Sequence, residues 1–230
     1  MRILLSIALV GLTTINLIAQ GPSENYLGSW YTYGSQHRLS ERFSLSPWAE
    51  LRFYEPSSNY NLAFISLGGN YHLKNNQTVG LVYAYLDIDT VFEFDHQPNI
   101  HEHRLCEQYT FSHSTSKLSI QHRARLEQRF LDFTDRNELQ NRFRYRLSLK
   151  YNLSRTIYIN VSEEPFVNFQ DQVFHENRFY TGFGFNVTSH SQLQIGYLKQ
   201  HIKKNNLNRI QVGISFTTDS RKPKPKLAQL

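Results

Sequence analysis

Cysteine and long hydrophobic runs are scarce in this 230-residue chain. The single Cys106 excludes an internal disulfide and offers no cysteine-rich metal site. Beyond the first twenty residues, no segment approaches the roughly 20 apolar residues that a transmembrane helix requires. The Gly-x-Ser-x-Gly motif of hydrolases and the His-Glu-x-x-His motif of zinc proteases are also missing. The sequence therefore lacks a disulfide framework, a helical span in its main part and these two catalytic motifs.

The first twenty residues are typical of a secretory signal. Met1-Arg2 provides a short positive start, Ile3–Leu12 is almost wholly apolar, and Ala19 is small enough for a cleavage site. A membrane anchor is the alternative, but polar residues at positions 13, 14 and 16 interrupt a run that is short for a spanning helix. No cysteine lies near the cleavage point, so a lipoprotein is not expected. We predict a signal peptide over residues 1–19.

Between Leu118 and Tyr151, apolar and charged residues alternate with a period of two, and most of the charges are arginine. Because successive side chains on a strand point to opposite faces, this period predicts two strands, at 118–130 and 139–151. A helix would scatter the arginines around its circumference, although arginine and leucine favour helices. Strands of about 13 residues are long for a globular protein, where 5–6 is usual. The pattern therefore predicts a transmembrane β-barrel, apolar outside and polar within.

Similar alternation recurs along the whole chain. Ten segments show it, at 42–54, 61–73, 78–88, 102–112, 118–130, 139–151, 156–166, 176–187, 192–200 and 209–216. A further segment at 26–35 is interpreted as a periplasmic lead-in, a plug or another strand. A periplasmic β-sandwich that binds a ligand is the alternative fold, but it would need shorter strands and fewer aromatics than the 14 Tyr and 16 Phe present. We predict an all-β, antiparallel up-and-down transmembrane barrel of about 10–12 strands, one domain over residues 20–218.

The connections between these segments alternate in length. Tight turns are expected at 74–76, 115–116, 153–155 and 188–191, longer loops at 55–60, 89–101, 131–137 and 168–175, and an intermediate one at 202–206. Bacterial barrels have short periplasmic turns and longer outer loops. With an even number of strands, both chain ends would lie in the periplasm. The basic, proline-rich tail at 219–230 is expected to be an extended periplasmic segment.

The polar face of these strands carries arginine and glutamate and should form the lumen. Opposite charges on adjacent strands lie within reach there, and arginine forms bidentate pairs with carboxylates. The expected lumen ion-pair network contains Glu50, Arg52, Glu102, Arg104, Arg123, Arg125, Glu127, Arg129, Arg142, Arg144, Arg146, Glu164, Glu176 and Arg178. The network favours a structural barrel with a closed, packed bore; a narrow anion-preferring channel for small solutes is the alternative.

Catalytic and metal sites are less well supported. His101 and His103 share one strand face while Glu102 opposes them, and Glu163 opposes Glu164 in the same way. We expect no catalytic residue, no metal and no cofactor, and a membrane-embedded hydrolase is the least favoured hypothesis. The net charge of +6 does not indicate nucleic acid, because most arginines share one face with glutamates. The expected partners are outer-membrane lipid and, for an open bore, a small anionic solute; we expect a monomer.

Several segments, in this order, resemble the DUF2490 family. They are Glu102-His103-Arg104-Leu105, Glu107-Gln108, His122 to Phe130, Arg142 to Arg146, Glu163 to Phe166, Glu176 to Arg178, and Gly182. The resemblance covers roughly Trp30 to Phe216 and is most specific around Arg-Leu-Glu-Gln-Arg-Phe. The family comprises exported proteins of unknown function, found largely in Bacteroidota-like bacteria and regarded as outer-membrane β-barrels. The resemblance implies an outer-membrane β-barrel. It also implies that barrel-assembly machinery recognises the strand end at Phe216. It implies no enzymatic activity or ligand.

Overall fold

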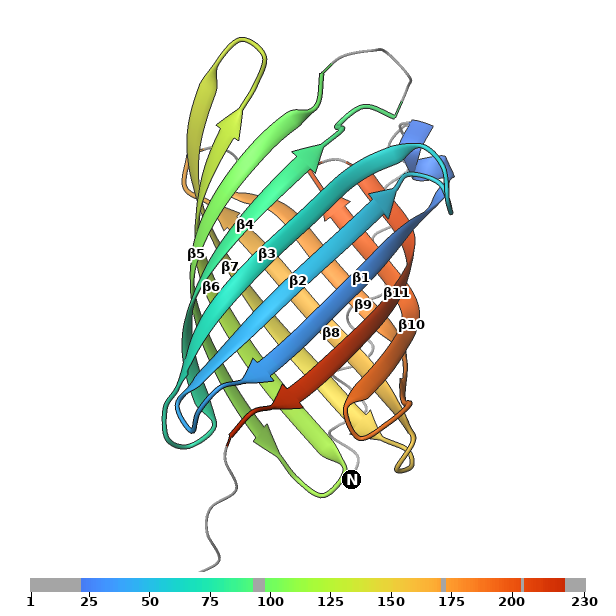
Figure 1. Cartoon of the computed structure of the whole chain (residues 1–230). Helices are drawn as coiled ribbons and strands as arrows, with labels where there is room; N and C mark the ends of the chain where they lie inside the picture. The colour runs from blue at the N-terminus through green and yellow to red at the C-terminus, as the bar shows by residue number, and fades with distance from the viewer. Residues whose placement is uncertain (1–21, 93–97, 171–172, 204, 222–230) are drawn as a thin grey trace, which may run out of the picture.

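The computed structural model describes residues 22–92, 98–170, 173–203 and 205–221, and its strands close into one barrel (Figure 1). The strands are β1 (Leu27–Arg38), β2 (Phe43–Phe53), β3 (Tyr60–His72), β4 (Gln77–Ile88), β5 (Ile100–Ser114), β6 (Leu118–Asp132), β7 (Asn137–Asn152), β8 (Ile157–Asn168), β9 (Phe174–Asn186), β10 (Ser191–Ile202) and β11 (Asn205–Asp219). A 3-10 helix, η1 (Pro22–Asn25), precedes β1. The predicted all-β barrel is confirmed. In the described part of the chain, no helix is long and apolar enough to cross a membrane.

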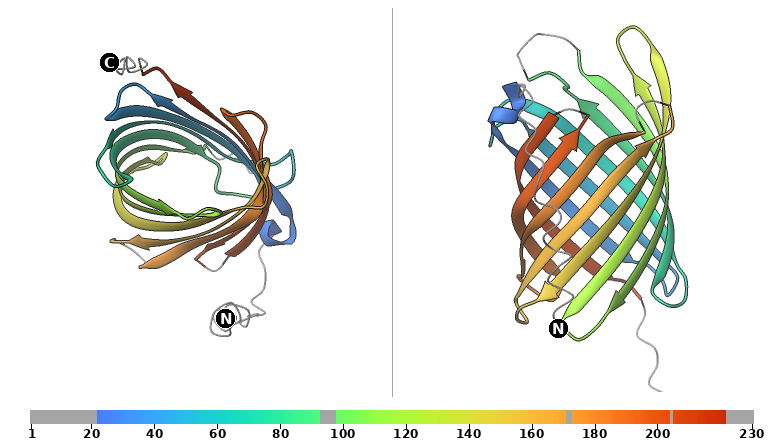
Figure 2. Two further views of the ribbon diagram at one scale, coloured as in Figure 1. Left: turned by 90° about the horizontal axis from the view of Figure 1, so that it is seen from below. Right: turned by 180° about the vertical axis from the view of Figure 1, so that it is seen from behind.

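The barrel closes between its first and last strands. Each strand from β1 to β11 pairs antiparallel with the next, whereas β1 pairs with β11 in parallel, from Leu27↔Asn208 to Arg38↔Asp219. Both strands point the same way in Figure 1 and complete the ring seen in Figure 2. An odd number of alternating strands requires this arrangement, because the first and the last then run in one direction. The purely antiparallel prediction is therefore wrong at this one ladder, and the segment at 26–35 is a strand rather than a lead-in or plug.

The odd strand number also changes the placement of the chain ends. Helix η1 and the start of β1 lie at one end of the barrel, whereas Asp219 lies at the other (Figure 1). The prediction that both chain ends share one side depended on an even number of strands, so it fails for the described termini. The predicted signal peptide at 1–19 and the tail beyond residue 221 lie outside the described residues and stay predictions.

The two ends of the barrel differ in their connections. The end near Asp219, called the turn end, carries the connections 39–42, 73–76, 115–117, 153–156 and 187–190. The opposite end, called the loop end, carries 54–59, 89–99, 133–136, 169–173 and 203–204. The expected longer loops occur at 54–59 and 89–99. The connection at 133–136 is shorter than expected because the β6/β7 ladder continues to Asp132↔Asn137.

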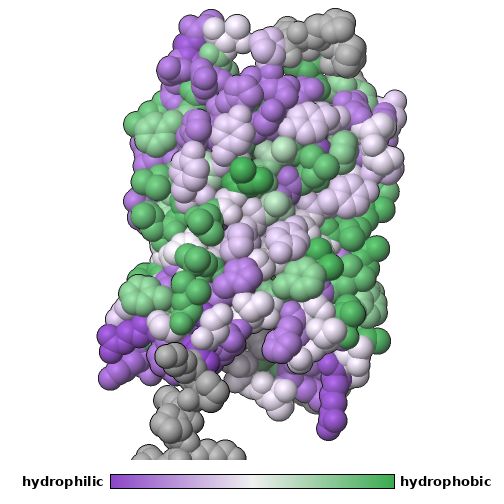
Figure 3. Space-filling model, viewed as in Figure 1, coloured by the Kyte–Doolittle hydropathy of each residue, from purple (hydrophilic) through white to green (hydrophobic). Residues whose placement is uncertain are grey.

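The outer wall is mainly apolar. Exposed hydrophobic side chains such as Leu81, Phe183 and Ile195 face outward, and hydrophobic surface gathers on the middle of the wall between more polar ends (Figure 3). Two carboxylates break this pattern near the middle of their strands, Glu107 on β5 and Glu163 on β8. Gln128 Nε2 donates to Glu107 at 3.2 Å, and the Asn177 amide donates to Glu163. An apolar band with a polar interior is the pattern of a transmembrane barrel.

Small residues make room for large inward side chains. Gly182 and Gly196 face each other across the β9/β10 ladder, and the Tyr180 ring lies over both. A Cβ built on Gly182 would lie 2.5 Å from the Ile195 carbonyl oxygen and 2.7 Å from the Gly196 Cα. Tyr180 also packs with buried Trp30 and Leu198. These glycines are therefore needed for close contact of backbone and ring inside the barrel.

Candidate functional site in the barrel lumen

The inward faces of β2 and of β5 to β9 bring the predicted charged residues together. Period-two alternation places them on the inner wall, and the register of neighbouring strands sets which side chains meet. All of the predicted residues except Arg125 and Arg146 form at least one ion pair within 4 Å. The twelve that do so are Glu50, Arg52, Glu102, Arg104, Arg123, Glu127, Arg129, Arg142, Arg144, Glu164, Glu176 and Arg178.

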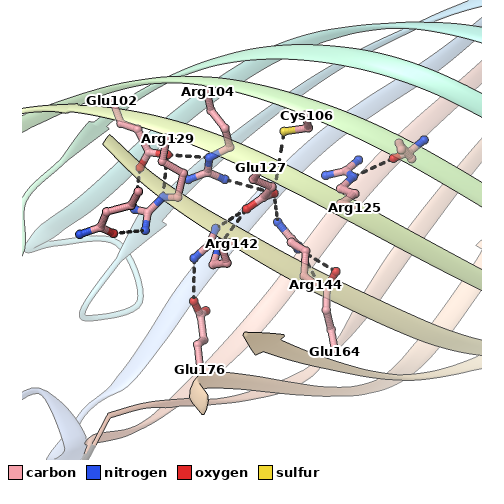
Figure 4. A network of polar contacts seen from close by, with 12 residues as sticks. Glu102, Arg104, Cys106, Arg125, Glu127, Arg129, Arg142, Arg144, Glu164 and Glu176 are labelled. Atoms are coloured by element: carbon pink, nitrogen blue, oxygen red, sulfur yellow. Dashed lines mark hydrogen bonds and ion pairs between the residues drawn. The ribbon is translucent and has the colours of Figure 1, made fainter. Parts of the chain in front are cut away.

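Glu127 lies at the centre of this network (Figure 4). Its carboxylate is fully buried and lies 2.6 Å from Arg142, 3.0 Å from Arg144 and 3.8 Å from Arg104. Glu102 is also fully buried, between Arg104 at 2.6 Å and Arg129 at 2.8 Å. Buried carboxylates are tolerated only when charge partners and hydrogen bonds replace water. These two glutamates therefore hold arginines of β5, β6 and β7 in fixed positions.

Two further glutamates extend the network to β8 and β9. Glu164 accepts from Arg144 at 2.8 Å and from Arg123 at 2.7 Å. Glu176 lies 2.6 Å from Arg178 and 3.5 Å from Arg142, and Gln200 Nε2 donates to it at 2.7 Å. The ion pairs thus run continuously from β5 to β9. On β2, Arg52 and Glu50 form a separate pair.

Aromatic rings inside the barrel contact the guanidinium groups. The Phe166 ring lies 4.8 Å from Arg142, 4.6 Å from Arg144 and 4.6 Å from Arg178. Trp30 lies 3.5 Å from Arg52 and 5.0 Å from Arg178. Guanidinium groups are attracted to aromatic faces at such distances. Sequence reasoning missed these inward rings, although Phe166 has the same parity on its strand as Glu164.

Four cations in the lumen have no carboxylate within ion-pair distance in the described part of the chain. Arg125 Nε donates to Gln108 at 2.7 Å, and Arg146 donates to Gln121 at 3.4 Å. Arg209 donates to the Phe53 carbonyl at 2.8 Å and to Asn61 at 3.0 Å. Lys150 Nζ lies 3.7 Å from the centre of the Tyr158 ring. Arg209 and Lys150 were absent from the predicted set, although each lies two positions from an inward residue, Gln211 and Ser148, and therefore shares its face.

A cavity of about 780 Å³ runs along the lumen. Ser35, Ser46 and Ser215 line it near the turn end, and Thr90 and Asn205 line it near the loop end. Its charged wall comprises three glutamates, Glu50, Glu164 and Glu176, against ten arginines and one lysine, Arg52, Arg104, Arg123, Arg125, Arg129, Arg142, Arg144, Arg146, Arg178, Arg209 and Lys150. Glu102 and Glu127 lie buried behind this wall. The wall of the cavity is therefore predominantly cationic.

The opposite character appears on β3 and β4. There the cavity is lined by Leu62, Phe64, Val82, Leu86 and Ile88. Tyr54 lines the cavity near the loop end, with Arg209 5.7 Å from its ring centre. Burial raises the pKa of Tyr54 to about 12, so this phenol stays neutral at ordinary pH. The lumen thus combines a cationic wall with a smaller apolar one.

The weaker candidates for metal binding do not converge. In the described residues, no group of three or more His, Cys, Asp or Glu side chains is placed to hold a metal ion. His101 Nδ1 and His103 Nδ1 lie on the outer wall, 3.0 Å and 2.7 Å from the hydroxyls of Tyr85 and Tyr83, while Glu102 faces the lumen. Cys106 is buried with its Sγ 3.9 Å from Glu127.

Comparison with known proteins adds a family and a distant structural likeness. The family model described as "Protein of unknown function (DUF2490)" matches residues 27–211, from β1 into β11, which confirms the resemblance. A search of the curated proteins finds no match. Among solved structures, a NanC porin has 13% sequence identity and a TM-score of 0.48, over 83% of this chain and 98% of that one.

Proposed function

The chain belongs to the DUF2490 family, and we propose that it is an outer-membrane barrel whose narrow bore passes small anions. One observation carries this proposal: a cavity of about 780 Å³ reaches from one end of the barrel towards the other, and cations dominate its wall. Cation-lined pores favour anions because the wall compensates for the water that an anion loses on entry.

The charge balance supports anion entry. The lining cations number eleven, and the carboxylates of the network number five when Glu102 and Glu127 are included, which leaves an excess of six positive charges. Arginine keeps its charge at any ordinary pH. The low dielectric of a protein wall focuses such a potential and raises the local concentration of counter-ions. The bore should therefore attract anions and repel cations.

The outer wall and the strand lengths support the proposed location. The shortest strand, β2, has 11 residues and the longest, β7, has 16, whereas about 9–11 residues span the hydrocarbon core. Short turns characterise the periplasmic side of such barrels, so we assign the turn end to the periplasm. The predicted signal peptide would deliver the chain to the periplasm, and assembly machinery would insert it as a monomer. Phe216, near the end of β11, then lies on the side from which that machinery acts.

A closed structural barrel is the competing proposal. Its support is the ion-pair network together with Phe166 and Trp30, which occupy part of the lumen. Current through refolded protein in a planar bilayer separates the two proposals: discrete conductance supports a channel, and silence at all voltages supports a closed bore. A lipid-hydrolysis assay on the same sample tests the least favoured proposal, a membrane-embedded hydrolase.

Location needs its own experiment. Membrane fractionation should place the protein with the outer membrane, and the detergent-solubilised protein should migrate differently on a gel before and after boiling, as folded barrels do. A freely soluble periplasmic monomer would contradict the proposed location and the channel together.

A further inference from the structure

Two successive inward-facing rungs of the β6/β7 ladder place like charges opposite each other. Arg123 lies opposite Arg146, and Arg125 lies opposite Arg144. All four side chains line the lumen cavity. Like charges directly opposite on adjacent strands are destabilising, and opposite residues have Cβ atoms only about 5 Å apart. This pairing therefore needs a compensating partner.

The carboxylates nearby compensate only part of this charge. Glu164 pairs with Arg123 and Arg144, and Glu127 pairs with Arg144 but also with Arg142. Among the described residues, the hydrogen bonds of the Arg125 and Arg146 side chains go to the glutamine oxygens described above. In Figure 4, Arg125 lies apart from the ion-paired groups. The buried Nε atoms of Arg123 and Arg146 have no hydrogen-bond partner among the described residues.

We infer that Arg123, Arg125, Arg144 and Arg146 form a binding site for a small oxyanion, a phosphate or carboxylate group, in the bore. The inference rests on the proposed anion-accepting lumen and assigns it one site. Arg125 and Arg146 are the principal ligands, because neither shares a carboxylate. Arg123 and Arg144, held by Glu164, supply fixed positive charge beside them.

The geometry selects an oxyanion over a spherical halide. A guanidinium presents a planar fork of donors that matches two oxygens of a carboxylate or phosphate. Successive inward positions on a strand are about 6.7 Å apart, so guanidiniums from both rungs can reach one small anion. Neutral donors beside the rungs, on Gln121, Ser148 and Ser162, also line the cavity and can bond to the remaining oxygens.

Calorimetric titration of inorganic phosphate into the refolded full chain in detergent micelles tests this site. At constant ionic strength, we expect saturable binding of phosphate. Its affinity should fall about tenfold or more in the double variant Arg125→Gln plus Arg146→Gln, because each substitution removes a charged hydrogen-bond donor. The two substitutions relieve repulsion, so the barrel should still fold, which heat-modified migration verifies. Arg136→Gln is the control, since Arg136 is exposed in the 133–136 connection and should leave binding unchanged. Absence of saturable binding in the unmodified protein, or equal binding in the double variant, would overturn the inference.

A second measurement requires no variant. Phenylglyoxal modifies accessible arginines, and peptide mass spectrometry reports each position. Phosphate should protect Arg125 and Arg146 and leave Arg136 reactive, whereas equal labelling with and without phosphate would contradict the site. Failure of the binding site and failure of the channel give different results. Anion-selective current without phosphate binding would contradict the site alone, and phosphate binding without current would contradict the channel alone.

Discussion

Glu127 and Arg142 occupy opposite positions in the β6/β7 ladder, and Arg142 donates two hydrogen bonds to the same carboxylate oxygen, from Nε at 2.9 Å and from a terminal nitrogen at 2.6 Å. The other oxygen of Glu127 accepts from Arg144 at 3.0 Å. One fully buried carboxylate thus fixes two guanidiniums of β7. The positions of the cations along the bore depend on this contact.

Replacing Glu127 with glutamine should destabilise the barrel strongly. The substitution leaves Arg104, Arg142 and Arg144 without their shared counter-charge in a buried site, and breaking such a pair costs about 3–5 kcal/mol. Urea unfolding in micelles, followed by tryptophan fluorescence, measures the free energy of unfolding. Glu138→Gln is the matched control, because the partly exposed Glu138 lies 4.0 Å from Arg136 and accepts from Gln140, whose amide a glutamine can still serve, so the substitution should cost less than about 1 kcal/mol. Equal effects of the two variants would contradict the central role of Glu127.

Two strand glycines, Gly182 on β9 and Gly69 on β3, should respond differently to alanine. At Gly182 a Cβ meets backbone atoms that cannot move aside, so Gly182→Ala should destabilise by about 1–3 kcal/mol. At Gly69 a Cβ meets nothing within 4 Å, and Gly69→Ala should be neutral or slightly stabilising because glycine weakens a strand interior. The same unfolding experiment compares them. A neutral Gly182→Ala would show that the β9/β10 contact is looser than described.

Glu107→Leu tests the lipid-facing wall. Glu107 is at the middle of β5, opposite Leu81 and Leu126 of the neighbouring strands. A charge on the lipid face is unfavourable near the bilayer centre, so leucine should stabilise the protein in vesicles by about 1 kcal/mol. Glu41→Leu, in the connection 39–42, should give no such gain. A loss of stability in Glu107→Leu would show instead that this carboxylate has a favourable partner in the membrane.

The parallel closure can be tested by cross-linking. Tyr31 and Val212 are partners in the β1/β11 ladder, and neighbouring strands bring Cα atoms into the range that a disulfide spans. Tyr31→Cys with Val212→Cys should form an intramolecular disulfide on mild oxidation, detected as a reducible shift in gel migration. Tyr31→Cys with Ile195→Cys should not form one, because Ile195 lies on β10, which pairs with the other edge of β11, so that β11 separates it from Tyr31. The reverse result would contradict the register.

Alternation in the sequence predicted the inward faces because a strand has a fixed period of two. It placed Arg142, Arg144 and Arg146 on one face without knowledge of any contact. The same rule applied to the last strand would have added Arg209, which lies two positions before the inward Gln211 and so shares its face. What alternation cannot provide is the number of strands, because the segment at 26–35 has the composition of either a strand or a lead-in. The direction of closure depends on that number.

Register and packing are likewise not visible in one strand. The opposition of Arg123 to Arg146 depends on the length of the turn at 133–136, which is shorter than the sequence suggested because pairing continues to Asp132. The cavity depends on the volumes and rotamers of side chains from many strands. The sequence therefore predicted a charged lumen but could not decide between a filled bore and an open one.

The reversal potential of single channels in a planar bilayer tests the central claim most directly. Under a potassium chloride gradient, we predict a reversal potential between zero and the chloride equilibrium potential. It should shift towards zero in the double variant Arg125→Ala plus Arg144→Ala, because these substitutions remove two positive charges from the wall. Arg136→Gln, outside the lumen, should leave the potential unchanged. A cation-selective current, or a bilayer that stays silent at every voltage although the protein has inserted and folded, would contradict the account.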